Sequence, residues 1–503
     1  MVDKSGGKYK ELATIGVSSS EEEIEQLVLK GREWIRRHRL ETEPELDLYG
    51  EEREAKEREM SQAEWFSSHI TNISLNGVDL VLNRVFQKIG FSNINDDIFR
   101  HLVISRLSYP SSKAATVEYL KNFYDEDVDL SKIYRYLDKV NDKYKDQIQD
   151  ISVRHTMELM GGNIGVMFYD VTTLYFEIDR EDELRKTGFS KEGRHKNPQI
   201  ILGILVSRDG YPLSYAIHEG NKYEGWTMLP VIREFVAKYN LDRDFIVVAD
   251  SGLMTSANID ELERLGYRYI IGARIRNESK EVIDRILSMP KVDRRMHEID
   301  KGGGRRLLIG YTEDRAKKDA YNREKGVRRL ERAYRSGRLS KENINKRGYN
   351  KFLEIGSDVE VSISYERIRQ DARWDGLKGY LTNTTIPTRE VYEAYHNLWN
   401  VEMAFRIAKS KLEIRPMFHF TRKRIEAHIC ICFVALKVYK ELDRIMKKSG
   451  MKISVNKALN MAQSVTTMTL YLPENDIHIE KTMLMPRHAP IVQLFDDEFW
   501  EAQ

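Results

Sequence analysis

Cysteine and long apolar runs are scarce in this sequence of 503 residues. Its two cysteines, Cys430 and Cys432, lie two residues apart in an apolar segment. Residues with that spacing on a helix do not face each other, so we expect two buried thiols and no disulfide between them. No segment approaches the roughly 20 apolar residues that span a bilayer, and the N-terminus lacks the apolar core of a signal peptide. These absences predict a soluble cytoplasmic protein.

The chain also lacks a strong net charge, because 81 Lys and Arg residues nearly balance 79 Asp and Glu residues. Bulk charge therefore does not select a class of partner. Hydrophobic residues make up 41% of the chain, which is enough for well-packed cores. A chain of this length is too long for one ordinary core, and we expect two to four domains.

The first 150 residues are highly charged and helical in pattern. Two amphipathic segments, 112–124 and 130–141, are typical of a helix-turn-helix, whose second helix would enter a major groove of DNA. Lys132 and Arg135 lie on or near the exposed face of that second helix, and we predict that they contact DNA. A simple helical hairpin explains the same pattern, and on the pattern alone it is slightly favoured.

Strand patterns begin near residue 164. Three consecutive strands, followed by alternating helices and strands, predict a mixed sheet with helices on its faces. Two strands run into an aspartate: Asp170 follows Val166–Tyr169, and Asp250 follows Phe245–Ala249. One such aspartate is commonplace at a turn. Two on neighbouring strands suit magnesium, which usually takes one or two carboxylates and leaves positions for water and phosphate.

A long helix is expected at about 388–412. Within it Tyr395, Glu402 and Lys409 are spaced seven apart, and seven residues advance a helix by nearly two turns, so the three lie on one stripe. Arg406 joins this stripe one turn after Glu402. Such a face could bind metal and grip a phosphate backbone. On spacing alone, an exposed helical face with an ordinary Glu402–Arg406 pair is slightly favoured.

Taken together and in order, these motifs resemble those of DDE transposases of bacterial insertion sequences. Residues 168–173 (Phe-Tyr-Asp-Val-Thr-Thr) and 247–252 (Val-Val-Ala-Asp-Ser-Gly) are similar to the first two catalytic motifs. Residues 395–409 are similar to the Tyr-x2-Arg-x3-Glu-x6-Lys signature of the insertion-sequence-four superfamily, and the overall resemblance, over about 97–470, is greatest to its 1634-like group. Leu398 stands at the arginine position of this signature. Either Arg406 or another cation replaces that phosphate contact, or the activity is impaired.

The resemblance implies an α/β fold, namely an RNase H-like mixed sheet flanked by helices, interrupted by a β-rich insertion and preceded by an α-helical N-terminal region. It implies that Asp170, Asp250 and Glu402 are catalytic and hold two ions of Mg²⁺ or Mn²⁺. Two ions would activate water, relieve charge on the phosphate and stabilise the leaving 3′-oxygen. The resemblance also implies that Tyr395, Arg406 and Lys409 contact DNA, and that Tyr395 and Lys409 hold phosphates near the scissile bond.

Residues 301–350 contain 16 Lys and Arg residues against six Asp and Glu residues. This basic arm could neutralise DNA phosphates, although a charge run is usually a solvated helical face, and the two readings are equally supported. The arginines with which we expect it to bind DNA are Arg328, Arg329, Arg332 and Arg335.

These features predict five regions. They are a helical N-terminal DNA-binding region (1–150), the first part of the catalytic core (151–275), a β-rich insertion with a basic arm (276–385), the second part of the core with Glu402 (386–445), and a C-terminal tail or dimerisation region (446–503).

The expected function is metal-dependent cleavage and strand transfer at insertion-sequence ends, by a cut-and-paste route with hairpin ends. The expected partners are double-stranded DNA, as terminal inverted repeats and target, and a second copy of the chain in the synaptic complex, in the bacterial nucleoid. Three alternatives stay open. One is an RNase H-like nuclease or resolvase without strand transfer, another is a catalytically inactive DNA-binding derivative, and the third is a structural protein with fortuitous motifs.

Overall fold

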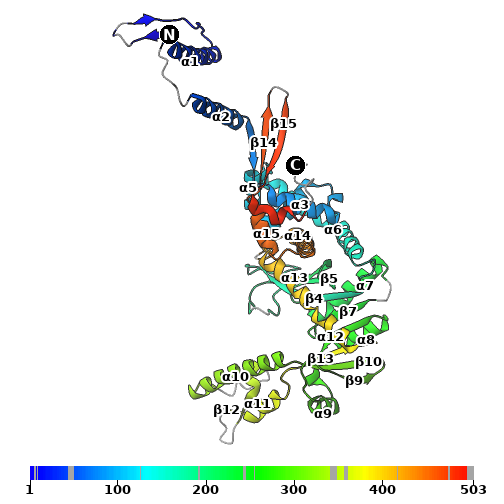
Figure 1. The fold of residues 1–503 in the computed structure, drawn as a ribbon. Helices are drawn as coiled ribbons and strands as arrows, with labels where there is room; N and C mark the ends of the chain where they lie inside the picture. The colour runs from blue at the N-terminus through cyan, green and yellow to red at the C-terminus, as the bar shows by residue number, and fades with distance from the viewer. Residues whose placement is uncertain are drawn as a thin grey trace. The chain divides into compact units, whose positions relative to one another are not determined.

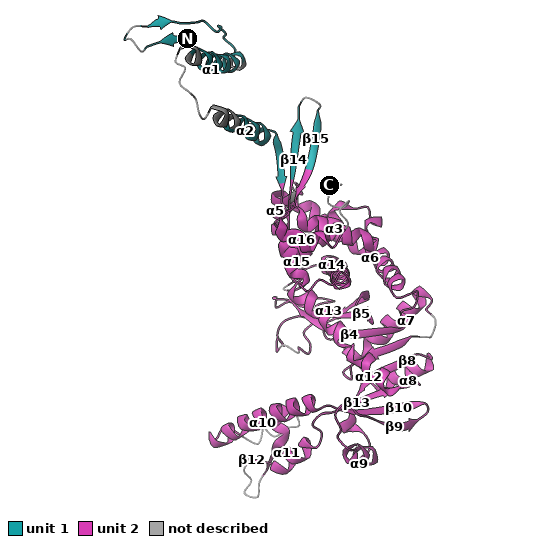
Figure 2. Cartoon of the chain, viewed as in Figure 1, with its two compact units in different colours: residues 1–73, 468–480 teal, residues 74–467, 481–503 magenta. Residues whose placement is uncertain are grey.

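The fold was analysed in a computed structural model of the chain. The structure describes residues 1–495 apart from 5–6, 8, 43–49, 125, 191–192, 242–244, 254, 340–347, 356–360, 416 and 474–475. Two compact units are present (Figures 1 and 2). The smaller unit contains residues 1–73 and 468–480, and the larger unit contains residues 74–467 and 481–503. In the described part of the chain, no helix is long and apolar enough to cross a membrane.

The smaller unit is built from short strands and exposed helices. Strands β1 (Val2–Asp3) and β2 (Lys10–Glu11) pair antiparallel, and β3 lies in a three-stranded sheet of order β15-β14-β3. The strands of this sheet are β3 (Ile70–Ser74), β14 (Thr466–Leu472) and β15 (Ile477–Met483). The helices of the smaller unit are α1 (Glu21–Thr42) and α2 (Gly50–Ser68).

The helical part of the larger unit is organised around α14 (Arg422–Lys448), which is buried on nearly every side because its middle, Ile425–Val438, is almost entirely apolar. It packs against α3, α4 and α6. The helices of this part are α3 (Gly77–Ile89), α4 (Asp97–Ser108), α5 (Lys113–Tyr124), α6 (Leu130–Leu159), α15 (Val455–Ala462) and α16 (Ala489–Val492).

The larger unit also contains an eight-stranded mixed sheet, in the order β6-β5-β4-β7-β8-β13-β10-β9. From the first strand β4, the antiparallel strands β5 and β6 extend the sheet one way, and the parallel strands β7 and β8 extend it the other way. This is the strand order of an RNase H-like core, and the predicted α/β fold with a mixed sheet flanked by helices is confirmed. The five strands are β4 (Val166–Tyr175), β5 (Gln199–Ser207), β6 (Pro212–Glu219), β7 (Ile246–Ala249) and β8 (Arg268–Ala273).

Helices cover both faces of this sheet. Alternate residues of a strand point to opposite faces. Phe168 and Val248 pack in the core that includes Val401 of helix α13 (Trp399–Ser410), whereas Met167 and Val247 pack in the other core. Helices α7 (Met228–Tyr239) and α8 (Ser256–Arg264) supply the apolar side chains of that second core.

The segment predicted as an insertion, 276–385, contributes three strands to the same sheet. Strand β13 (Leu377–Thr382) pairs antiparallel with β8, and β10 (Arg305–Tyr311) and β9 (Met296–Gly302) follow it. The segment therefore continues the layout of the sheet, because an edge strand such as β8 leaves backbone groups that a further strand can pair. Its other elements are α9 (Lys280–Ser288), α10 (Glu313–Arg335), β11 (Leu353–Ile355), β12 (Val361–Ile363) and α11 (Tyr365–Ala372).

Helix α6 is much longer than the predicted segment 130–141 and continues past residue 150 into the catalytic part. Its buried side chains include Ile133 and Leu137, and the Ser152 Oγ donates a hydrogen bond of 2.6 Å to the carbonyl oxygen of Pro212, at the start of β6. Lys132 and Arg135 are exposed. Contact of this face with DNA stays a prediction, in a helix whose other face supports the sheet.

A buried polar cluster joins α6, α14 and the sheet. The Glu441 side chain is fully buried and accepts hydrogen bonds of 2.7 Å from the Tyr211 hydroxyl and from Arg444 Nη2. Lys437 Nζ donates a hydrogen bond of 2.9 Å to the Ser152 carbonyl oxygen. Burial raises the pKa of Glu441, but hydrogen bonds from Arg444, His155 and Tyr211 outweigh this and lower it well below its usual range. The carboxylate is therefore a charged structural element.

Replacement of this carboxylate tests the cluster. We expect Glu441→Ala to lower the free energy of unfolding by about 3 kcal/mol, because it leaves buried charged and polar groups without their partner. Asp443→Ala on the same helix removes an exposed pair with Lys447 and should cost less than about 1 kcal/mol. Chemical denaturation followed by circular dichroism measures both, and equal losses would contradict a structural role for Glu441.

Candidate functional site

The pairing of β4 with β7 places Asp170 and Asp250 side by side. The two strands are parallel, and their last paired residues are Tyr169 and Ala249. Asp170 and Asp250 directly follow these paired residues along the chain, and neighbouring strands lie about 5 Å apart. Asp170 lies two residues after Phe168 in β4 and so shares its face, and Asp170 and Asp250 both line a cavity with Glu402 of α13. Both therefore point to the face that α13 covers.

Asp170 does not end its strand as predicted. Strand β4 continues to Tyr175, because β5 pairs with it as far as Gln199 while β7 stops at Ala249. Asp170 is therefore paired with β5 on one side, whereas on the other side the pairing of β4 with β7 ends one residue before it. Its carboxylate is half-buried, and Oδ1 accepts a hydrogen bond of 2.8 Å from the Val171 backbone N–H.

Asp250 is exposed and is held by Tyr395. This tyrosine lies on α12 (Thr388–His396) and is 4% exposed. Its hydroxyl donates a hydrogen bond of 2.9 Å to Asp250 Oδ1. Burial, and then the charge of Asp250, raise the pKa of Tyr395, so the hydroxyl keeps its proton and remains a donor. We expected the Tyr395 hydroxyl to contact a DNA phosphate. In the structure it donates its hydrogen bond to Asp250.

The predicted single helix over 388–412 is two helices. Helix α12 ends at His396 and α13 begins at Trp399. Backbone hydrogen bonds of the i to i+3 kind, such as Leu398 N–H to Tyr395 O at 3.0 Å, join them. This tighter turn changes the rotation between the helices, so Tyr395 does not share a continuous stripe with Glu402. Tyr395 is buried, whereas Glu402 and Arg406 are exposed.

Asp170, Asp250 and Glu402 line one cavity of about 530 Å³. Tyr395 and the buried Leu398 also line it. Arg406 and Lys409 are not among its lining residues in the described part of the chain. The three predicted acids, which are far apart in the sequence, thus open onto a common space.

Carboxylate oxygens suit a hard divalent cation, and two adjacent aspartates suffice for magnesium, which fills its other positions with water and phosphate. Across the residues that the structure describes, no three acidic, histidine or cysteine side chains are arranged to hold a single ion. The donor chemistry and the adjacency of Asp170 and Asp250 fit a metal ion.

Lys378 is a residue of this site that the sequence analysis did not assign. It lies on β13, half-buried, and its Nζ is 4.5 Å from the centroid of the Tyr395 ring. Burial and then Arg315 lower the pKa of Lys378, while Asp250 and Glu402 oppose this decrease. A single charged residue in the apolar run Leu377–Thr382 was the available signal. It did not reveal which element the lysine faces.

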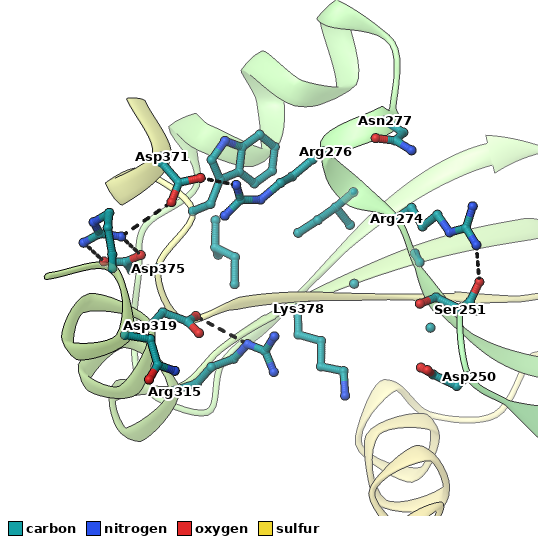
Figure 3. A pocket seen from close by; sticks show the side chains of 18 of the residues that line it. Asp250, Ser251, Arg274, Arg276, Asn277, Arg315, Asp319, Asp371, Asp375 and Lys378 are labelled. Carbon is teal, nitrogen blue, oxygen red and sulfur yellow. Dashed lines mark hydrogen bonds and ion pairs between the residues drawn. The ribbon is translucent and has the colours of Figure 1, made fainter. Parts of the chain in front are cut away.

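A second cavity of about 690 Å³ adjoins the first and is shown in Figure 3. The two cavities share Asp250, Arg315, Lys378 and Tyr395. Arg315 lies on the first turn of α10 and pairs with Asp319 at 3.6 Å. The second cavity therefore reaches Asp250. Its charged lining residues are Arg274, Arg276, Arg315, Arg323, Lys351 and Lys378, with Asp250, Asp319, Asp371 and Asp375.

Helix α10 holds the arginines that we predicted to bind DNA. Its buried residues Gly326 and Leu330 face the small core around β11 and β12. Residues 340–347 of the predicted arm lie outside the described residues. The predicted DNA-binding arginines are all exposed, and they are Arg328, Arg329, Arg332 and Arg335.

Gly272 on β8 leaves the space that the Tyr395 hydroxyl occupies, since a Cβ there would lie 2.6 Å from that oxygen. We expect Gly272→Ala to lower the free energy of unfolding by about 1–3 kcal/mol through overpacking. The double variant Gly272→Ala, Tyr395→Phe should lose less than the sum of the two single losses, because the clashing oxygen is gone.

Gly252→Ala is the matched control, because its Cβ would make only an ordinary contact of 3.9 Å with Asp250. It should change stability by less than about 0.5 kcal/mol. Additive losses in the double variant, measured by denaturant unfolding, would show that Gly272 does not position Tyr395.

Parts of this chain are similar to known transposases. The transposase for insertion sequence element IS231E of Bacillus thuringiensis subsp. finitimus is 25% identical over 134 residues, which are 25% of this chain and 27% of that protein. The transposase for element IS231C of Bacillus thuringiensis subsp. berliner is 24% identical over 135 residues, again 25% of this chain and 27% of that protein. The matches thus span about a quarter of the length of these curated relatives.

Among solved structures, a piggyBac transposase synaptic complex with hairpin DNA aligns over 79% of each chain, with 8% identity and a TM-score of 0.39. That likeness is too low to support an argument. Residues 164–437 match the family described as transposase DDE domain. Because this match covers more than half of the chain, the protein belongs to the family with a transposase DDE domain.

Proposed function

We propose that this protein is a transposase that cuts the DNA ends of an insertion sequence and joins them to target DNA. Asp170, Asp250 and Glu402 would be its catalytic residues and would hold Mg²⁺ or Mn²⁺. The observation that carries the proposal is the pairing of Tyr169 with Ala249, which brings two carboxylates together on a cavity that Glu402 also lines. The similarity to transposases of insertion-sequence elements supports the same function.

Each acidic residue has a distinct structural support. Asp170 is fixed by the β5 ladder, Asp250 by the Tyr395 hydroxyl, and Glu402 by a helix whose other face is buried. A pair of divalent ions held by these carboxylates would activate a water or a DNA 3′-OH and would stabilise the leaving oxygen. The chain's part is to hold these carboxylates at one place and to hold the DNA backbone beside them.

Tyr395 acts in this proposal as a positioning residue for Asp250, since its hydroxyl is already donated there. Arg406 and Lys409 extend along α13 from Glu402 and would contact the backbone further from the cut. The exposed arginines of α10, together with Lys132 and Arg135, would bind the flanking duplex. Hairpin ends, a cut-and-paste route and a homodimer that pairs two ends complete the proposed pathway.

Removal of one charge from each acid tests the catalytic assignment. We expect Asp170→Asn, Asp250→Asn and Glu402→Gln each to slow DNA cleavage by about 10³-fold or more, because each removes several kcal/mol of metal-dependent stabilisation. The substrate is a plasmid carrying the DNA that flanks the coding region on both sides, incubated with Mg²⁺. Cleavage and joining are followed by gel electrophoresis.

Glu393→Gln is the control for this series, because Glu393 is an acid of α12 that pairs with Arg389 and does not line the cavity. It should cut as the unchanged protein does. Nicking without joined product by the unchanged protein would favour the nuclease alternative. Absence of any cutting, with DNA binding unaffected by Asp170→Asn, would contradict the proposal in favour of an inactive DNA-binding derivative.

The basic face of α10 makes a separate prediction. Arg328 and Arg332 are four residues apart on the exposed side of this helix. Each phosphate contact contributes about 0.9 to the slope of log K against log salt concentration. Replacement of both arginines by serine should therefore reduce this slope by about two, measured by fluorescence anisotropy with a duplex of the flanking DNA.

Lys447→Ser with Lys448→Ser removes two exposed charges from the end of α14 and is the matched control. It should leave the slope unchanged. If the α10 variant and this control have the same slope, the α10 face does not bind DNA.

A further inference from the structure

The cationic side chains of the catalytic cavity come from one part of the chain. In the described residues, the lysine and arginine side chains that line this cavity are Arg294, Arg315 and Lys378. All three belong to the segment 276–385, whereas Asp170, Asp250 and Glu402 lie outside it. This segment therefore does more than extend the sheet, because it supplies the positive charge of a site whose acids come from the rest of the core.

Lys378 is the most firmly placed of these cations. Its strand, β13, is paired on both sides, by β8 and by β10, and Lys378 itself lies opposite Gly310. Tyr380, two residues further on, packs in the core that α12 and α13 share, so Lys378 points to the same face as Asp170 and Asp250. Figure 3 shows the Lys378 and Arg315 side chains reaching into the pocket beside Asp250.

The ammonium group of Lys378 lies near the acidic residues but does not form an ion pair with any carboxylate of the described residues. It lies over the Tyr395 ring at 4.5 Å and over the Tyr380 ring at 5.8 Å, and it senses the charges of Asp250 and Glu402. Within the part of the chain that the structure describes, no carboxylate oxygen is within 4.0 Å of this nitrogen. Aromatic faces attract the cation but accept none of its three N–H groups as a carboxylate would, so these remain available.

A cation at this place opposes the binding of a metal ion to the same carboxylates. An anion that enters between them offsets this repulsion, and the three carboxylates alone would repel a DNA phosphate. Leu398 is apolar and buried, so this part of the wall supplies no charge of its own. A phosphate oxygen that accepts hydrogen bonds from Lys378 satisfies each of these conditions, since a lysine ammonium binds phosphate as a point charge.

We propose that Lys378, with Arg315 beside it, binds the DNA phosphate that enters the catalytic cavity. This inference rests on the proposed function. It assigns to the segment 276–385 a direct part in the active site: the segment contributes the charge that holds the scissile strand against Asp170 and Asp250.

The test removes the charge of Lys378 and the charge of single DNA phosphates, separately and together. Lys378→Met and Lys378→Arg are compared with the unchanged protein on duplexes of the flanking DNA. In these duplexes, one phosphate at a time near the cleavage position is replaced by an uncharged methylphosphonate. Lys301→Met is the matched control, because Lys301 lies on β9 and pairs with Glu278 outside the cavities.

Lys378→Met should slow cleavage of ordinary DNA by about 100-fold, as expected for loss of one positioned donor, and Lys378→Arg should restore much of the rate. At one phosphate position, the methylphosphonate should slow the unchanged protein and Lys301→Met, and have little further effect on Lys378→Met. Binding of the same duplexes in Ca²⁺ is measured by fluorescence anisotropy. The methylphosphonate at the same phosphate position should weaken binding by the unchanged protein and have little further effect on binding by Lys378→Met.

Three outcomes would overturn the inference. The first is an unchanged cleavage rate in Lys378→Met, and the second is methylphosphonate effects that add to the effect of Lys378→Met at every position. The third is a Lys378→Met variant that binds Mn²⁺ more tightly, as measured by electron paramagnetic resonance, but responds to phosphate charge as the unchanged protein does. The last result would make Lys378 a counter-ion for the acids. Failure of the unchanged protein to cut any DNA would instead contradict the proposed function, so the two failures are distinguishable.

Discussion

The parallel pairing of β4 with β7 is the constraint from which the arrangement of the site follows. The ladder ends at Tyr169 and Ala249, so the next residues, Asp170 and Asp250, are held about one strand spacing apart and on one face of the sheet. A shift of this register by one residue would turn one of the carboxylates to the opposite face. The apolar residues that lock the register, such as Phe168 and Val248, are therefore as necessary to the site as the acids.

The remaining parts of the site are placed on that frame by elements distant in sequence. Gly272 on β8 leaves room for the Tyr395 hydroxyl, and this hydroxyl orients Asp250. Helix α13 brings Glu402 to the same cavity, and β13 brings Lys378 to it. The charges are thus interleaved: acids from the core strands and α13, cations from the segment 276–385. A cavity lined by both positive and negative charges suits DNA, because the cations can bind its phosphates while the carboxylates bind divalent metal ions.

Much of this could be predicted from local patterns. Apolar runs that lead into Asp170 and Asp250 revealed both strands, and the resemblance of the motifs to insertion-sequence transposases implied the RNase H-like fold, which is confirmed. The break between α12 and α13 was missed. His396 in the last turn of α12 and Asn397 directly after it are helix-ending signals, but the seven-residue spacing of Tyr395, Glu402 and Lys409 indicated one continuous helix. The position of Lys378 in this cavity was also missed. It depends on β13 pairing with β8 more than 100 residues away, and residue spacing along the chain does not reveal such long-range pairing.

The central claim is that Asp170 and Asp250 bind the same metal ions. Anomalous scattering from crystals of the protein with Mn²⁺ and a duplex of the flanking DNA tests it most directly. The account predicts an anomalous peak between these two carboxylates, within coordination distance of both and beside a DNA phosphate. A peak held by only one of them, or located elsewhere on the chain, would contradict it.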